Sequence, residues 1–159
     1  MGQKIHPNGF RVGITRDWDS RWYARKDTFG DLLVEDDKIR RFIKNEYYFA
    51  GIPKVEIERK GDQSMILVHC ARPGGLTRRK GGKVDKLKEQ LEQLSGKTIT
   101  LNIHEITQPD LNAQLVAENI AEQLEKRASF RRAMKRSLQN TMDRGARGIK
   151  LRVAGRRGG

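Results

Sequence analysis

Positive charge is concentrated at one end of this chain, and it limits what that end can bury. The 159 residues include 33 Lys and Arg and 20 Asp and Glu. Positions 126–159 hold twelve of these basic residues and only one of the acidic residues, which gives that segment a formal charge of +11. The net charge of the whole chain is +13, so the first 125 residues carry only +2. This asymmetry indicates a polyanionic partner, with nucleic acid as the first candidate, because each neutralised phosphate releases condensed counterions.

Length and composition allow one or two domains and argue against several classes of protein. The chain is 36% hydrophobic and 33% charged, and no apolar run approaches the roughly 20 residues of a membrane span. The polar amino terminus does not resemble a signal peptide. The single cysteine, Cys70, can form no internal disulfide, which suits a reducing compartment. We therefore expect a cytoplasmic protein without a membrane anchor.

Residues 1–30 show no regular periodicity and are predicted to form an amino-terminal arm. Both tryptophans, Trp18 and Trp22, lie in this arm among arginines. Two interpretations stay open. The aromatic side chains attach the arm to a core, or they lie with Arg against nucleic acid, where stacking contributes roughly 1–3 kcal/mol per base.

Residues 31–108 are predicted to form one α/β domain. Helical spacing of Ile39, Ile43 and Tyr47 indicates a helix, and alternation around Ile57 indicates a strand. Gly61 and Asp62 predict a hairpin. The expected elements, in order, are a helix over 36–50, strands over 55–58 and 65–68, a short helical turn, a loop at 78–83, a helix over 83–94 and a strand over 98–106.

Residues 109–159 are predicted to form a second, incomplete α/β unit of two helices and one strand. The first helix follows Pro109, the second is capped by Ser129 and runs to about Met142, and the strand covers 149–153. Because a lone strand cannot complete a sheet, we expect either that the chain continues or that a partner closes this surface.

Two segments are candidate phosphate-binding sites. The first is the loop with Arg78, Arg79, Lys80, Gly81 and Lys83, which precedes a predicted helix, whose amino terminus favours anions. A solvated basic turn is the alternative. No Walker-type nucleotide loop is present.

The second candidate is the predicted 130–142 helix. Arg131, Arg132, Lys135 and Arg136 share one arc, while Phe130, Met134 and Leu138 share the neighbouring arc, which is predicted to face the core. Like charges four residues apart destabilise a free helix by roughly 0.2–0.5 kcal/mol per pair. Residues 127–142 contain no acid that would offset them. An external anion would offset this repulsion. The alternative, a helix face kept for solubility, explains the positive charge but not the absence of Glu.

Catalytic chemistry is not indicated by the sequence. His6, His69 and His104 are scattered, and we expect the last two to be structural and Cys70 to be buried. Asp17 and Asp19 are expected to form a turn or salt bridges rather than a metal site. The sequence therefore predicts no enzyme, no cofactor, no metal and no small-molecule substrate.

Several motifs spread along the chain resemble those of the bacterial-type small-ribosomal-subunit protein three family. They are MGQKIHP at 1–7, GFR at 9–11, DWDSRWY at 17–23, VEIER at 55–59, ARPG at 71–74, VDKL at 84–87, QLVAENIA at 114–121 and SFRRAMKR at 129–136. The similarity covers essentially all 159 residues.

The resemblance implies a type II KH domain, with the element order α-β-β-α-α-β and a Gly-x-x-Gly loop that binds nucleic-acid backbone. It also implies a place in the head of the small ribosomal subunit, with ribosomal RNA, messenger RNA and neighbouring ribosomal proteins as partners. In that family, the positions of Arg131, Arg132 and Lys135 face the messenger entry channel and are associated with unwinding messenger structure. Contacts of the arm with ribosomal RNA are assigned to Lys4, Arg11, Arg16 and Trp22.

One motif departs from the family pattern. Arg78 stands where the first glycine of the Gly-x-x-Gly loop is expected, so binding there would depend on side-chain charge more than on backbone N–H groups. Three rival functions stay open: a KH-type RNA-binding regulator outside the ribosome, a metal-dependent nuclease using Asp17 and Asp19, and a basic membrane-surface protein. The 130–142 helix lacks the aromatic interfacial face typical of the last class.

Overall fold

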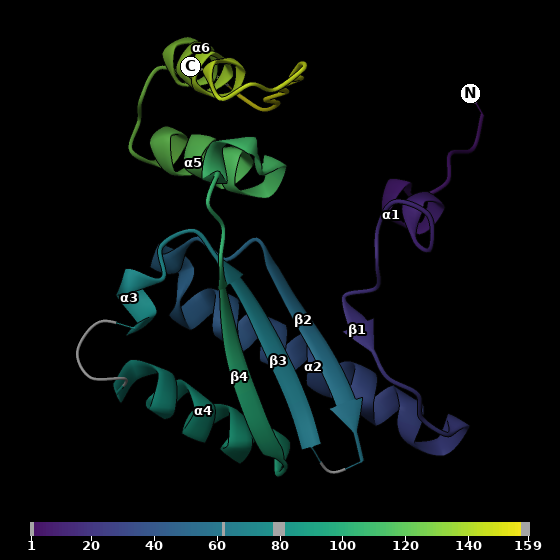
Figure 1. Ribbon diagram of the computed structural model, residues 1–159. Coiled ribbons are helices and arrows are strands. Elements are labelled where there is room, and N and C mark those ends of the chain that lie inside the picture. The colour runs from purple at the N-terminus through teal and green to yellow at the C-terminus, as the bar shows by residue number, and fades with distance from the viewer. Residues whose placement is uncertain (1, 62, 78–81, 157–159) are drawn as a thin grey trace. The chain divides into compact units, whose positions relative to one another are not determined.

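The chain divides into two units, Met1–His104 and Glu105–Gly159, in a computed structural model that describes residues 2–61, 63–77 and 82–156 (Figure 1). Unit 1 contains α1 (Pro7–Arg11), β1 (Ser20–Arg21), α2 (Lys26–Glu46), η1 (Tyr48–Ala50), β2 (Lys54–Lys60), β3 (Gln63–Cys70), α3 (Gly74–Thr77), α4 (Gly82–Ser95) and β4 (Thr98–Glu105). Unit 2 contains η2 (Pro109–Leu111), α5 (Ala113–Glu125) and α6 (Phe130–Asp143).

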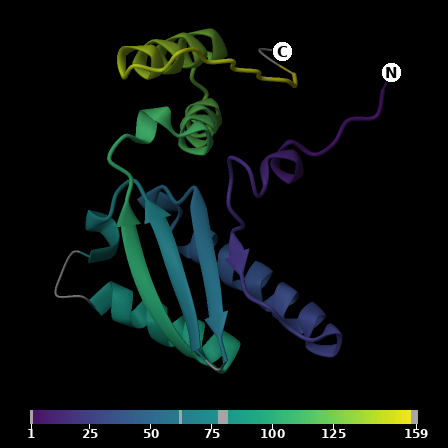
Figure 2. The same ribbon diagram turned by 45° about the vertical axis from the view of Figure 1, so that its right-hand side comes forward.

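Unit 1 is a four-stranded sheet with one face covered by α2 and α4 (Figures 1 and 2). The strand order is β1-β2-β3-β4, with β1 parallel to β2 and β2 antiparallel to β3. Side chains that alternate along the strands enter one hydrophobic cluster with the apolar stripes of both helices. Ile57, Ile66 and Ile99 of the sheet meet Ile39 of α2 and Leu91 of α4 in this core.

The mixed α/β class and the KH element order are confirmed, since α2, β2, β3, α3, α4 and β4 follow one another as α-β-β-α-α-β. The hairpin between β2 and β3 is also confirmed, with Ile57 opposite Ile66. The start of the first long helix is wrong by ten residues, because α2 begins at Lys26 and not near 36. None of residues 26–35 is buried. The sequence of this half of the helix therefore lacks the apolar periodicity that would indicate a helix.

The strand predicted over 149–153 does not form, and that prediction is wrong. Ile149, Leu151 and Val153 are half-buried while Lys150 and Arg152 are exposed, so the alternation in the sequence corresponds to an alternation in burial. A strand also needs a hydrogen-bonded neighbour. In the described part of the chain, no strand pairs with this segment, which has no regular secondary structure. The elements described in unit 2 are all helices.

A buried carboxylate, Asp36 in α2, connects the arm to the sheet. Its side chain is completely buried and accepts hydrogen bonds from Ser20 Oγ at 2.6 Å and Trp22 Nε1 at 2.8 Å. Arg59 of β2 donates to its other oxygen through Nε at 3.1 Å and Nη2 at 2.5 Å. Burial alone would lower the pKa of Arg59, but the hydrogen bonds and charges of Asp36 and Glu35 raise that pKa above its ordinary value.

Replacing Asp36 with Ala should destabilise unit 1 by about 3 kcal/mol, because a buried guanidinium loses a charge partner and two further donors lose their acceptor. Urea denaturation of the full chain, followed by circular dichroism, measures this loss. Asp37→Ala is the matched control: the neighbouring Asp37 is exposed and pairs with the exposed Arg41 at 2.9 Å, so its loss should be within about 0.5 kcal/mol. Equal, small effects of the two substitutions would contradict this role of Asp36.

Candidate nucleic-acid interface

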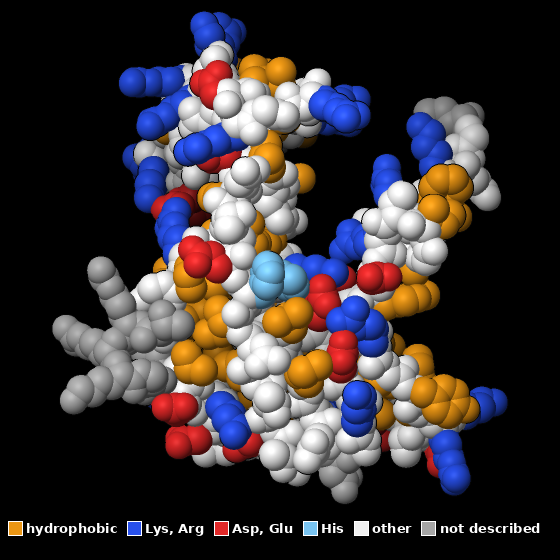
Figure 3. All heavy atoms as spheres, viewed as in Figure 1, with side chains coloured by type: hydrophobic (Ala, Val, Ile, Leu, Met, Phe, Trp, Pro, Cys, Tyr) orange, Lys and Arg blue, Asp and Glu red, His pale blue; other side chains and the backbone are white. Residues whose placement is uncertain are grey.

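Four cations of α6 point away from the body of unit 2. Arg131, Arg132, Lys135 and Arg136 are all exposed, as the sequence predicts for the outer face of this helix. Figure 3 shows Lys and Arg side chains gathered over α6 and over the end of α5 that leads into it. The helix itself is supported by α5, against which it packs.

The face of α6 that is buried differs in part from the predicted one. Ala133, Ser137 and Thr141, spaced four residues apart, are buried, and the Thr141 hydroxyl donates to the carbonyl of Ser137 at 2.9 Å. Leu138, predicted to face the core, is 43% exposed. Phe130 and Met134 of the predicted apolar arc are half-buried, so that prediction is confirmed in part. The fully buried positions are small side chains, which let two helices approach closely whatever their hydrophobicity.

The cations on α6 are not neutralised within the part of the chain that the structure describes. No ion pair joins any of the four to an Asp or Glu there. The Arg131 guanidinium lies 5.8 Å from the centroid of the Phe130 ring, a cation–π contact that leaves its charge available. This helix therefore presents a concentrated positive field on one side.

The amino terminus of α6 is only partly as expected. Ser129 occupies the N-cap position, as predicted, but its hydroxyl makes no capping hydrogen bond. No acidic residue lies in the first turn either. The two arginines of that turn, Arg131 and Arg132, are therefore placed unfavourably with respect to the helix dipole.

The cations on the open face of the sheet in unit 1 are, in contrast, neutralised locally. Arg21 pairs with Glu56 at 2.9 Å and Glu58 at 2.6 Å, and Lys54 Nζ lies 2.7 Å from Glu56. Burial alone would raise the pKa of Glu56, but hydrogen bonds and charge from Lys54 and His69 outweigh burial and lower it. The ionised carboxylate is thereby favoured, and this face offers little free positive charge to a polyanion.

Most of the predicted KH loop lies outside the described residues, namely Arg78, Arg79, Lys80 and Gly81, and so does the side chain of Lys83. The two segments that flank the loop are anchored in the core. Leu76 of α3 and Leu87 of α4 are each 1% exposed. The helices α3 and α4 are therefore each fixed to the core at an inner face.

The predicted RNA-contacting residues of the arm are not equally free. Lys4 and Arg11 are exposed, and Arg11 donates to the Pro7 carbonyl at 3.3 Å. Arg16 donates to Asn8 Oδ1 at 2.8 Å and pairs with Asp19 at 3.4 Å. The indole N–H of Trp22 is engaged by Asp36. Trp22 is half-buried and therefore serves the attachment of the arm.

The residues considered for catalysis show structural contacts. Nε2 of His69 lies 3.2 Å from Oε1 of Glu56, and the His69 ring centroid is 5.1 Å from that of His104. Cys70 is buried. Asp19 pairs with Arg16 and Lys54. Within the described ranges, no group of three or more His, Cys, Asp or Glu could hold a metal ion. Over the same ranges, no helix combines the length and apolarity that a membrane crossing needs.

Comparison with known proteins identifies the family. A model of the KH domain matches residues 38–111, and a model described as "Ribosomal protein S3, C-terminal domain" matches residues 120–159. "Small ribosomal subunit protein uS3" of Syntrophomonas wolfei is 53% identical over all of this chain, which covers 70% of that relative. The chain belongs to the uS3 family. The proteins of that name from Finegoldia magna and Rhodopirellula baltica are 55% and 52% identical, and the chain covers 65% and 70% of them.

Membership of the uS3 family confirms the resemblance noted from the motifs. The KH match covers the second half of α2 through η2, and the C-terminal-domain match covers the second half of α5, from residue 120, and all of α6. The family is one of ribosomal proteins and not of enzymes, in agreement with the prediction of no catalytic site.

Sequence reasoning missed the residues that support the candidate interface rather than those that form it. Asp36 falls on the same helical stripe as Ile39 and Ile43, and a carboxylate in an apolar stripe is the signal that could have identified it. The close packing at Gly75 of α3 was also missed. A β-carbon built on Gly75 would lie 2.7 Å from Cε2 of Phe49 in η1, so a larger residue would require the Phe49 ring or α3 to move.

Gly75→Ala should therefore displace the Phe49 ring or α3 and destabilise unit 1 by about 1–3 kcal/mol, the typical effect of overpacking. Gly74→Ala is the matched control, because a β-carbon on Gly74 meets nothing within 4 Å. Urea denaturation compares the two. In a Phe49→Ala background, Gly75→Ala should lose most of its effect, and an undiminished effect would show that the Phe49 contact is not its cause.

Proposed function

We propose that this chain is a structural component of the small ribosomal subunit, bound in the cytoplasm to ribosomal RNA and to neighbouring ribosomal proteins. The uS3 relatives bear the name of a small-subunit protein and match along the whole chain. The excess of positive charge supports a polyanionic partner. The arm residues Lys4, Arg11, Arg16 and Trp22, together with the basic loop at 78–83, provide the contacts with ribosomal RNA.

The finer part of the proposal is that α6 lies along messenger RNA at its entry into the subunit. The observation that carries it is the set of four exposed cations, Arg131, Arg132, Lys135 and Arg136, without acidic partners among the described residues. A rigid helix packed on α5 holds them in one row. An RNA strand would supply the negative charge that this helix lacks.

These side chains would act on phosphates and not on bases. Arg and Lys contacts to phosphate position a strand without specifying its sequence, which suits a channel through which every messenger passes. The described residues include no catalytic constellation, so the unwinding of messenger structure would be passive. The cations hold each strand as it separates, and translocation by the ribosome supplies the work.

Replacing Arg131, Arg132 and Lys135 together with Ala should weaken binding of unrelated single-stranded RNAs to a similar degree. The slope of log K against log salt should become shallower by about 2, since each phosphate contact contributes about 0.7. Fluorescence anisotropy with unstructured RNA oligomers at several salt concentrations measures the slope. Lys38→Ala, Arg41→Ala and Lys60→Ala in one chain form the control, because they remove three exposed cations from unit 1. The same loss in both variants would mean that net charge, and not α6, binds RNA.

Ribosome association is tested separately by expressing the tagged chain in a bacterial cell and sedimenting the lysate through a sucrose gradient. The chain should travel with the small subunit at moderate salt. A regulator acting outside the ribosome would remain in the free fractions. Recovery only there would favour that alternative and overturn the ribosomal proposal.

A further inference from the structure

The turn between α5 and α6 has a specific hydrogen-bond pattern. The N–H of Arg127 donates to the carbonyl of Leu124 at 2.9 Å, and the N–H of Ala128 donates to that of Gln123 at 3.0 Å. These two bonds form a Schellman motif that ends α5 with the residue after the C-cap in a left-handed conformation. That residue is Arg127, with φ of 60°.

Arginine is an unfavourable choice for this position. The left-handed conformation brings the β-carbon close to the following carbonyl oxygen, so glycine is the usual residue there. Among the described residues, Arg127 is the only one other than glycine with a positive φ, whereas six glycines adopt one. Backbone geometry therefore does not explain why the chain has Arg at 127.

Contacts within the chain do not explain it either. The Arg127 side chain is exposed, and in the described ranges no hydrogen bond or ion pair engages its guanidinium. The adjacent Lys126, by comparison, is paired with Glu122 one turn earlier. A cation needed only for solubility could stand at position 128 without the unfavourable φ. The strain at Arg127 is thus retained without a visible intramolecular benefit.

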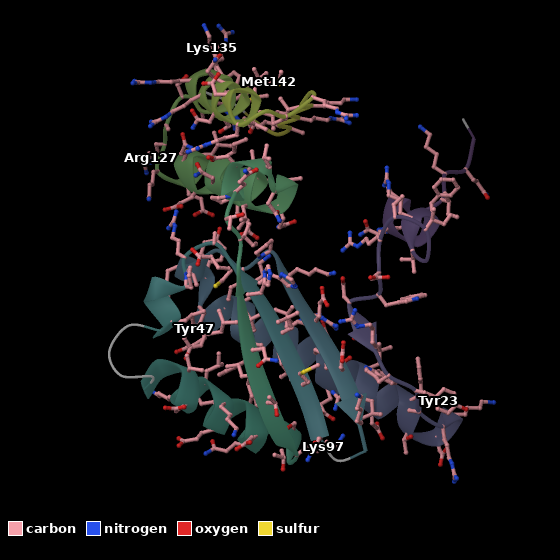
Figure 4. The ribbon with its side chains drawn as sticks, in the orientation of Figure 1. Tyr23, Tyr47, Lys97, Arg127, Lys135 and Met142 are labelled. Carbon is pink, nitrogen blue, oxygen red and sulfur yellow. The ribbon has the colours of Figure 1, made fainter. Side chains whose placement is uncertain are left out.

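Arg127 lies beside the amino-terminal end of α6, which carries Arg131 and Arg132 in its first turn. It stands two residues before the N-cap Ser129. Figure 4 labels Arg127 at the end of α5 and Lys135 on α6, and both side chains project outward from unit 2. A guanidinium is suited to bidentate contact with a phosphate.

We propose that Arg127 binds a phosphate of single-stranded RNA and extends the cationic surface of α6 onto the α5–α6 turn. Glycine at this position would relieve the backbone strain but would provide no positive charge. Arginine accepts the strain and provides a guanidinium at the turn. This inference rests on the proposed function, because it assigns an additional contact to the same RNA strand.

The experiment compares Arg127→Gly and Arg127→Ala in the full chain. Both remove the charge, but only glycine also removes the backbone strain. RNA affinity should fall about fivefold at 0.1 M salt in both variants, and the salt slope should become shallower by about 0.7, as expected for one phosphate contact. The urea midpoint should rise for Arg127→Gly alone. Arg127→Lys should keep the salt slope, and Arg41→Ala, an exposed arginine of unit 1, should leave binding unchanged.

The outcomes separate this inference from the proposal on which it rests. Unchanged affinity and slope in both Arg127 variants, with weakened binding in the triple α6 variant, would overturn the role of Arg127 alone. Unchanged binding in the triple variant would overturn the proposed role of α6. If Arg127 had a purely structural role, RNA affinity would change in the same direction as the urea midpoint. Tighter or unchanged RNA binding by the more stable Arg127→Gly variant would therefore also contradict the inference.

Discussion

The buried carboxylate of Asp36 joins three parts of unit 1 that are distant in sequence. It accepts from Ser20 and Trp22, which lie before α2, and from Arg59 of β2. Removing a carboxylate and a guanidinium from water is unfavourable unless good geometry and further hydrogen bonds compensate. Here each oxygen of Asp36 has at least one donor, so the pair is compatible with the core and aligns β1 beside β2.

The two units differ in how their charged side chains are paired. In unit 1, acids accompany the cations on the sheet, as Glu56 does for Arg21 and Lys54. In unit 2, α6 has one acid, Asp143, near its end, and that carboxylate accepts from Gln139 at 2.8 Å. The exposed cations of α6 are therefore left without acidic partners among the described residues, as the proposed binding of a polyanion requires. The two units differ in this respect, because acids balance the cations on the sheet of unit 1 and do not balance those of α6.

The sequence predicted those elements whose apolar residues face a core, and it failed elsewhere. Ile39, Ile43 and Leu91 identified the two helices that cover the sheet, and each lies in the core. The start of α2 was missed because its first ten residues bury nothing. The packing face of α6 was predicted only in part, since Ala133 and Ser137 are buried by close helix contact rather than by hydrophobicity. The segment 149–153 alternates correctly but is not a strand, because pairing depends on a neighbour that no local pattern reveals.

The sequence by itself determined the order of the core elements and the positions of the α6 cations, because periodicity and charge are local properties of the chain. Only the tertiary structure decided that Trp22 is held by Asp36, that Gly75 lies against the Phe49 ring, and that Arg127 is in a left-handed conformation. Each of these depends on the distance between residues that are not neighbours in sequence, or on a backbone angle set by the end of a helix. Residue identity alone carries no record of such distances and angles.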